Sequence, residues 1–146
     1  MSAELTYDDV EVGQELPPLT CELTPEMVSW YLDEAEETNP IYTDHELARR
    51  MGLGGPVTPP LIFCMYAPPP EILAALGRQF PAHTIHAGSE FTFAGPVRPG
   101  DVITSRAKIK DKYIKKGRKF VVQEIMSYNQ KGELVLANVH TSVWPK

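Results

Sequence analysis

Residues 61–67 read LIFCMYA, and this stretch decides how the rest of the chain is arranged. It is apolar on every side, which suits a helix buried in a core better than a helix on the surface. A loop rich in glycine and proline, GLGGPVTPP (52–60), leads into it, and PPP (68–70) interrupts it, because proline disrupts a helix interior. The helical pattern restarts at Pro70 with EILAALGRQ. The sequence therefore predicts a central apolar helix that prolines cut short.

The second half of the chain has the character of β-strands. Alternating or β-rich segments follow one another over 89–97, 101–110, 119–128 and 133–144, with turn sequences such as RPGD and NQKG between them. About four long strands of this kind predict an antiparallel meander. Because the helices come first, the whole chain of 146 residues indicates a single α+β domain, 1–146, in which the sheet wraps round the apolar helix.

The residues before the central helix predict shorter elements. A short strand is expected within 15–24, and a helix with one apolar face follows over 25–37. That helix ends before Asn39-Pro40, since the residue before a proline is pushed away from helical angles. A second short helix is expected over 43–51.

The composition excludes several classes of protein. With 42% hydrophobic and 23% charged residues, the chain is typical of a soluble globular protein. No apolar run approaches the roughly 18 residues that a membrane span needs, and no signal peptide pattern opens the chain. Two cysteines, Cys21 and Cys64, are too few for a disulfide framework and indicate reduced thiols in the cytoplasm. Histidine and cysteine never cluster at ligand spacing, so we expect no metal.

Charge is distributed unevenly along the chain. Thirteen acidic residues precede Arg49, the first basic one, whereas seven of the fourteen basic residues lie in 108–119. The net charge of −5 argues against a nucleic-acid partner. The basic segment either meets a phosphorylated small molecule or forms a lysine-rich edge hairpin that prevents sheet-to-sheet aggregation.

Three stretches resemble one family. ETNPIYTDHELARRMGLGGPVTPP (37–60) is similar to a loop pattern Asp-x-Asn-Pro-x-His followed by a short helix and a glycine-proline loop. HAGSEFTFAGPVRPGD (86–101) matches a central hairpin, and NQKGELVLANVHTSV (129–143) matches a closing strand. The chain thereby resembles the MaoC-like (R)-specific enoyl-CoA hydratases and 3-hydroxyacyl dehydratases, over nearly all of residues 20–144. The resemblance implies the hot-dog fold, a curved antiparallel sheet wrapped round a central apolar helix.

The resemblance also implies a chemistry. In catalytic members an aspartate and a histidine of the loop hold one water, which adds across the double bond of a trans-2-enoyl thioester or leaves in the reverse dehydration. A base with a pKa near neutrality takes the water proton. A backbone N–H at the start of the central helix stabilises the developing enolate oxygen.

This sequence departs from the family pattern at each of these positions, although Asn39 and Pro40 match it. Glu37 stands in the aspartate position. Tyr42 stands in the histidine position, and a phenol with an ordinary pKa of about 10 is a poor base at neutral pH. Pro60 falls, by ungapped counting, on the oxyanion glycine and has no backbone N–H. Losing one oxyanion donor typically costs about 10²–10³ in rate, so these departures predict that the site has lost its own chemistry.

A motif-degenerate subunit of the N-terminal-dehydratase-domain type is therefore the favoured function. It would shape the acyl pocket for a motif-complete MaoC-like partner, or form a homodimer, in fatty acid metabolism. The expected ligand is an acyl-CoA or acyl-carrier thioester, with no cofactor besides that substrate, and Lys115 and Lys116 would hold the phosphates of coenzyme A. Three other functions stay open: a stand-alone hydratase that uses Glu37 and Tyr42, an acyl-CoA thioesterase, and a hot-dog that only binds acyl-CoA.

The individual loop residues each have a second interpretation. Glu37 is either a general base or a solvated residue at a helix end. Tyr42 either donates a hydrogen bond to the thioester carbonyl or packs against the loop. Asn39 is expected to fix the loop through side-chain to backbone hydrogen bonds, as Asn does in turns.

Further pocket candidates come from the central helix and the strand after it. Met65 and Tyr66 either line an acyl tunnel or belong only to the core. His86 opens the HAGSEF strand and either points into a cleft or lies on the surface. His83 and His140 have no supporting pattern, so a histidine without a functional role is the favoured interpretation of each.

Overall fold

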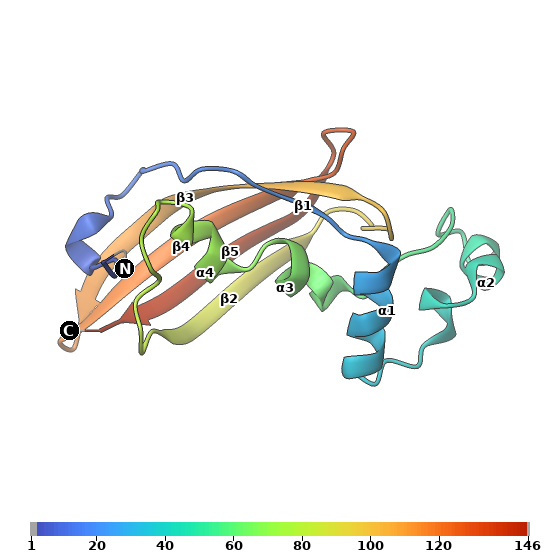
Figure 1. Cartoon of the computed structure of the whole chain (residues 1–146), viewed down its shortest axis with the longest axis horizontal. Helices are drawn as coiled ribbons and strands as arrows, with labels where there is room; N and C mark the ends of the chain where they lie inside the picture. The colour runs from blue at the N-terminus through green and yellow to red at the C-terminus, as the bar shows by residue number, and fades with distance from the viewer. Residues whose placement is uncertain (1–2, 146) are drawn as a thin grey trace.

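The computed structural model of the protein describes residues 3–145 and contains a five-stranded antiparallel sheet. The strand order is β1-β3-β4-β5-β2, so β1 and β2 form the two edges. Figure 1 shows a curved sheet with short helices lying across one face. The strands are β1 (Leu19–Glu22), β2 (Ile85–Phe93), β3 (Val102–Lys115), β4 (Arg118–Tyr128) and β5 (Leu134–Trp144). The predicted α+β class is confirmed.

The helices are short and fall into two groups. In Figure 1, α1 (Pro25–Glu34) and α2 (His45–Arg50) lie beyond one end of the sheet, whereas both chain termini lie toward the other end. On the face of the sheet lie α3 (Phe63–Tyr66) and α4 (Pro69–Ala74). Three 3-10 turns complete the set: η1 (Tyr7–Asp9), η2 (Pro40–Tyr42) and η3 (Pro60–Ile62). No helix within residues 3–145 has the length and apolar composition to cross a membrane.

Helix α1 ends at Glu34, so the predicted end at residue 37 is wrong. Glu36 has a φ of 49°, in the left-handed region, and its N–H donates to the carbonyl of Asp33 at 3.1 Å. The Glu37 N–H donates to the Leu32 carbonyl at 2.9 Å. These two bonds form the helix-ending motif that satisfies orphan carbonyls of the last turn. The chain thus leaves the helix before the proline at position 40 has any effect.

The sequence predicts a central helix that is buried on every side, and this prediction is wrong. Ile62 and Tyr66 are 1% and 2% exposed, whereas Leu61 is 55% exposed and Cys64 is exposed as well. Prolines confine it to η3 and α3, and a helix lying on a sheet presents only one face to the sheet. The described part of the chain supplies no second layer, so an apolar face of this helix points away from the core.

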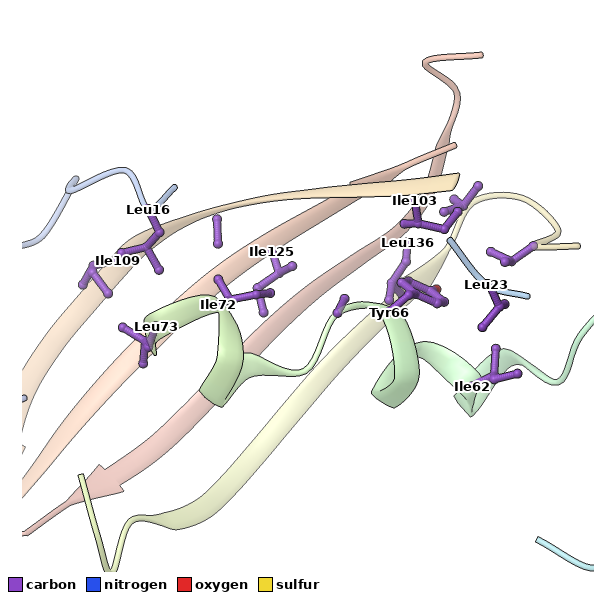
Figure 2. Close-up of a cluster of buried hydrophobic side chains, with 14 of the residues drawn as sticks. Leu16, Leu23, Ile62, Tyr66, Ile72, Leu73, Ile103, Ile109, Ile125 and Leu136 are labelled. Carbon is purple, nitrogen blue, oxygen red and sulfur yellow. The ribbon is translucent and has the colours of Figure 1, made fainter. Parts of the chain in front are cut away.

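The core lies between the central helices and the sheet. Figure 2 shows the side chains of Tyr66, Ile72 and Leu73 on the helical side and those of Ile103 and Ile125 on the sheet. All five are at most 2% exposed. Burial of one such aliphatic side chain contributes about 1.5–3 kcal/mol, so this contact holds α3 and α4 on the sheet.

Strand β2 begins and ends four residues earlier than the predicted 89–97. A register shift between His86 and Gly88 interrupts the alternation of side chains, and this hides the first part of the strand in the sequence. β2 pairs with β5 on one side and is last in the strand order, so its outer edge is unpaired within the described chain.

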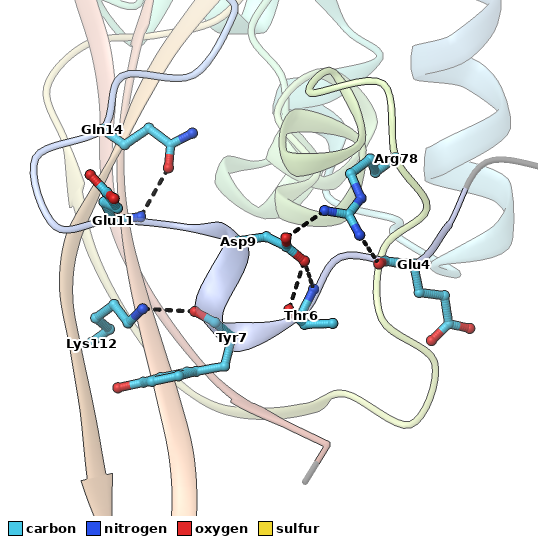
Figure 3. A network of polar contacts seen from close by, with 8 residues as sticks. All are labelled: Glu4, Thr6, Tyr7, Asp9, Glu11, Gln14, Arg78 and Lys112. Atoms are coloured by element: carbon cyan, nitrogen blue, oxygen red, sulfur yellow. Dashed lines mark hydrogen bonds and ion pairs between the residues drawn. The ribbon is translucent and has the colours of Figure 1, made fainter.

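The N-terminal segment is tied across the sheet by polar contacts (Figure 3). Nη1 of Arg78 lies 2.6 Å from Oδ1 of Asp9, and Nη2 donates to the Glu4 carbonyl at 2.7 Å. Lys112 Nζ donates to the Tyr7 carbonyl at 2.7 Å and lies 4.1 Å from the centre of the Tyr7 ring. These contacts fix the segment at the end of the sheet opposite α2.

Candidate functional site

The loop that carries the degenerate motif is held by its own side chains. Oε1 of Glu37 accepts a hydrogen bond from the Asn39 backbone N–H at 2.8 Å. Oδ1 of Asn39 accepts one from the Ile41 N–H at 3.2 Å and caps η2. Asn39 therefore fixes the turn, as Asn does in such loops. Glu37 is half-buried, and its carboxylate is engaged in the same turn.

Two tyrosines, a carboxylate and a thiol gather where this loop meets the central helix. Burial and then the charge of Glu37 raise the pKa of Tyr42, so the phenol stays protonated at neutral pH. The pKa of Tyr31 is also raised, chiefly by burial. Electrostatic repulsion from Cys64, Glu37 and Tyr42 raises it further. Tyr31 packs partly buried against the core, as its spacing on the apolar face of α1 indicates.

The head of the central helix lacks backbone donors. Pro59 and Pro60 have no N–H, so Leu61 supplies the first one at this helix start. Pro60 and the buried Tyr66 line the same cavity of about 70 Å³, together with Phe93. Two residues expected to contact substrate are thereby brought together. Burial raises the pKa of Tyr66 above its ordinary value.

Arg98 holds the glycine-proline loop that leads into the central helix. Its Nη1 donates to the Pro56 carbonyl at 2.8 Å and its Nη2 to the Leu53 carbonyl at 2.6 Å. A Cβ at Gly54, which has a φ of 74°, would lie 3.2 Å from this guanidinium. The arginine of the PVRPGD turn therefore positions the loop, a role for which its bidentate geometry is suited.

His86 lies in a second pocket, of about 200 Å³, beside the end of α3. Ser89 Oγ is 2.9 Å from His86 Nε2 and 3.3 Å from His140 Nδ1, and the two imidazole rings stack with centroids 4.7 Å apart. Burial and then His86 lower the pKa of His140 to about 4. No pattern in the sequence indicates this contact between His86, Ser89 and His140. Only the register of β2 on β5, which sets Ser89 opposite His140, reveals it.

The remaining predicted residues lie apart from these two cavities. Met65 packs half-buried against the core, and its carbonyl accepts from the Cys21 thiol at 3.7 Å. Lys115 and Lys116 are exposed at the β3–β4 turn, where Lys116 has a φ of 50°. This turn lies toward the chain termini, at the opposite end of the molecule from α2 (Figure 1). The structure therefore does not bring the two lysines to the 37–42 loop of the same chain.

Within residues 3–145 there is no group of three or more His, Cys, Asp or Glu side chains placed to hold a metal ion. Cys21 and Cys64 are both free thiols.

Comparison with known proteins gives the fold and the family. The family described as "FAS1-like, dehydratase domain region" matches residues 11–138. A UPF0336 protein of Streptomyces griseus is 27% identical over 137 residues, covering 90% of this chain and 91% of the relative.

Solved structures of hydratases and dehydratases superimpose on this chain. A MaoC-like dehydratase from Rhodospirillum rubrum has a TM-score of 0.76 at 22% identity, covering 97% of this chain and 98% of the other. The (R)-hydratase PhaJ1 from Pseudomonas aeruginosa has a TM-score of 0.74 at 21% identity, covering 96% of this chain and 85% of the other. The HadBC (3R-hydroxyacyl-ACP dehydratase) complex from Mycobacterium tuberculosis has a TM-score of 0.77 at 22% identity, covering 90% of this chain and 96% of the other.

These likenesses confirm the predicted hot-dog fold, and the match over residues 11–138 identifies the family. The chain belongs to the FAS1-like dehydratase domain family and has the hot-dog fold.

Proposed function

We propose that this chain is the non-catalytic, substrate-accommodating subunit of an enoyl-thioester hydratase or 3-hydroxyacyl-thioester dehydratase. It would hold an acyl thioester while a motif-complete MaoC-like partner adds or removes water. Membership of the family does not by itself imply this role. We also propose a cytoplasmic location, as the composition predicts.

One observation carries the proposal: the loop offers no side chain suited to act as a base at neutral pH. Deprotonating water calls for a group with a pKa near neutrality. Tyr42 has its pKa raised further by burial and by Glu37, and the Glu37 carboxylate already accepts the Asn39 N–H at 2.8 Å.

The helix start supports the same conclusion. Stabilisation of an enolate oxygen requires a donor aimed at the position of the developing charge. Pro59 and Pro60 remove two consecutive N–H groups there, and the first donor is moved to Leu61. A stand-alone enzyme would need Leu61 to replace the missing donor and Glu37 to act as the base.

A partner subunit is part of the proposal because apolar surface and a sheet edge remain uncovered. Leu61 and Phe93 are 55% and 47% exposed, and Cys64 of the same helix is exposed. The outer edge of β2 has no strand beside it within residues 3–145. Exposed apolar groups and free strand edges are typical sites for association. The HadBC dehydratase is itself a complex, which favours a heteromer here.

Activity of the lone chain tests the proposal. We would follow the loss of enoyl absorbance with trans-2-enoyl-CoA substrates from short to bulky, and expect no turnover. The triple substitution Glu37→Asp, Tyr42→His and Pro60→Gly restores the family pattern at all three positions. It is expected to gain measurable hydration, as is the wild-type chain when it is co-expressed with a motif-complete partner.

Turnover by the wild-type chain alone would overturn the proposal, particularly if Glu37→Gln then abolished it. Release of free thiol instead of hydration product would indicate a thioesterase. Substituting acyl carrier protein for coenzyme A in the same assays would distinguish the two possible carriers.

A further inference from the structure

The break in the central helix leaves a pocket beside α3. Helix α3 ends at Tyr66 and α4 begins at Pro69, and the pocket, of about 200 Å³, lies beside this break. Phe63 and Phe91, whose ring centroids are 4.8 Å apart, form one side of it. The surface of its lining is almost entirely apolar, and no Asp, Glu, Lys or Arg of residues 3–145 lines it. The pocket therefore favours hydrocarbon and disfavours charge.

The polar side chains at this pocket bond to one another. Ser89 Oγ lies 2.9 Å from His86 Nε2 and 3.3 Å from His140 Nδ1. Burial and then His86 lower the pKa of His140 to about 4, so this ring is neutral at pH 7. The serine hydroxyl and these two ring nitrogens already have partners, so an alkyl chain can lie against them without leaving them unpaired.

The other cavities of the described chain suit an alkyl chain less well. Lys108 and Glu124 line a cavity of about 180 Å³, and Glu4 and Lys119 line one of about 230 Å³. Hydrocarbon in either cavity would displace water from charged groups, which is unfavourable. The cavity at Pro60 has no charged lining residue among those described, but it measures only about 70 Å³. Among these four cavities, the pocket beside α3 combines the larger size with an uncharged lining.

The size of this pocket limits the length of the chain that it holds. An apolar cavity of ~150 Å³ accepts benzene, which has six carbon atoms. On the same scale, about 200 Å³ has room for about eight carbon atoms, whereas about 70 Å³ has room for about three. The pocket therefore matches an alkyl chain of medium length.

The pocket also adjoins the loop that carries the degenerate motif. Cys64 lines the pocket, and its thiol lies close enough to Tyr31 to raise the pKa of that phenol. Glu37 and Tyr42 act on the same phenol, so the loop and the pocket meet at Cys64. A thioester held at the 37–42 loop would therefore extend its acyl chain past Cys64 and into the pocket.

We propose that the pocket beside α3 holds an alkyl chain of up to about eight carbon atoms, so that the substrate class of this subunit is a medium-chain acyl thioester without a charged terminal group. The inference rests on the proposed function, because it assumes that the chain holds an acyl thioester. Cys64 stands at the entrance of the pocket and controls the length of chain that enters.

Binding of a series of thioesters tests the inference without requiring turnover. Butyryl-, hexanoyl-, octanoyl- and dodecanoyl-CoA are titrated into the purified chain by calorimetry. We expect the affinity to rise at least about tenfold from butyryl-CoA to octanoyl-CoA, because methylene groups are buried, and then to level off at dodecanoyl-CoA. Octanedioyl-CoA, with a carboxylate at its far end, should bind at least about tenfold more weakly than octanoyl-CoA, because that carboxylate would lose its water in an uncharged pocket.

The variant Cys64→Trp separates an acyl pocket from a subunit contact. Cys64 is exposed, so the indole requires no rearrangement of the core while it fills the entrance of the pocket. The variant should bind octanoyl-CoA no more tightly than butyryl-CoA, whose own affinity should not change. Val12→Trp, at a residue that is 57% exposed and lies outside the pocket, should keep the wild-type dependence on chain length.

Three results would overturn the inference and leave the proposed function standing. They are equal affinity for butyryl-CoA and octanoyl-CoA, a steady rise through dodecanoyl-CoA, and binding of octanedioyl-CoA as tight as that of octanoyl-CoA. If Cys64→Trp abolished self-association in sedimentation and left the affinity for octanoyl-CoA unchanged, the pocket would be a subunit contact, and the inference would again be overturned. Failure of every thioester to bind would overturn both the inference and the proposed function.

Discussion

The Glu37 carboxylate and the Asn39 backbone are joined by a hydrogen bond, with 2.8 Å between Oε1 and N. The bond closes the turn that follows α1, and Asn39 Oδ1 caps the next turn through the Ile41 N–H at 3.2 Å. The carboxylate that resembles a catalytic residue therefore stabilises the loop. The contribution of this hydrogen bond to stability can be separated from the effect of the negative charge on Glu37.

Replacing Glu37 tests this structural role. Glu37→Gln keeps an acceptor oxygen and should leave the free energy of unfolding within about 0.5 kcal/mol of wild type. Glu37→Ala removes the acceptor and should lower it by about 0.5–1.5 kcal/mol, the usual net value of one hydrogen bond. Urea denaturation of both variants gives the comparison. Equal stability of Glu37→Ala and wild type would show that the bond contributes nothing.

Arg98 should be the more sensitive position. Its two hydrogen bonds reach the carbonyls of Leu53 and Pro56, so Arg98→Met should destabilise the protein by about 1.5–3 kcal/mol. Arg98→Lys should recover only part of this, since an ammonium cannot reproduce the planar fork. Urea denaturation measures the free energy of unfolding of each variant. Arg106→Met, at an exposed arginine, is the matched control. A lysine variant as stable as wild type would contradict the bidentate role.

Glu36 offers a stabilising substitution. It holds a φ of 49° at the end of α1, where glycine incurs no side-chain clash. Glu36→Gly should raise the free energy of unfolding by about 0.5–1 kcal/mol, because relief of backbone strain exceeds the entropy cost of glycine. Glu34→Gly, within the helix, should instead be destabilising by about 0.5–1 kcal/mol. Thermal or urea unfolding that orders the two variants the other way would reject this explanation.

The Asp9 contact predicts a loss of stability in strong acid. Hydrogen bonds from Thr6 and then Arg78 lower the pKa of Asp9 from 3.8 to about 2. The stability that follows from this shift is present above pH 3.8 and is lost as the pH falls through about 2. Urea midpoints of wild type and Asp9→Asn should therefore differ at pH 6 and converge near pH 2. Asp8→Asn, at an exposed neighbour, should give no such convergence.

His140 predicts a second pH dependence in a different window. Its pKa is about 4 in the folded chain against 6.5 ordinarily, so between these values the unfolded chain binds a proton that the folded chain does not. Stability should therefore fall as the pH is lowered from 6.5 toward 4, and His140→Gln should flatten that slope. Denaturation midpoints across this range provide the measurement. An unchanged slope in His140→Gln, or an equal effect from the exposed His83→Gln, would contradict the assignment.

Several properties follow from the sequence because they depend on residue type or on local pattern. Alternation and turn residues predict β4, β5 and the start of β3 to within one residue, since the period of a strand is a local property. The predicted end of β3 at residue 110 is wrong, because the strand continues to Lys115 beyond a register shift between Ile109 and Asp111 that interrupts the alternation. The deficits of the degenerate site are also local: proline has no N–H in any fold, and a phenol has a high pKa unless its surroundings lower it. For Tyr42 the surroundings raise it instead.

Tertiary structure decided the features that depend on nonlocal contacts. His86, Ser89 and His140 meet because the register of β2 on β5, set by a bulge and by pairing across 51 residues, places them on one face. The early end of α1 depends on a left-handed glutamate, which propensity disfavours. The open face of the central helix likewise follows from what the sheet leaves uncovered. Periodicity along one segment carries no information about the partner that a side chain meets, because distant strands and layers supply that partner.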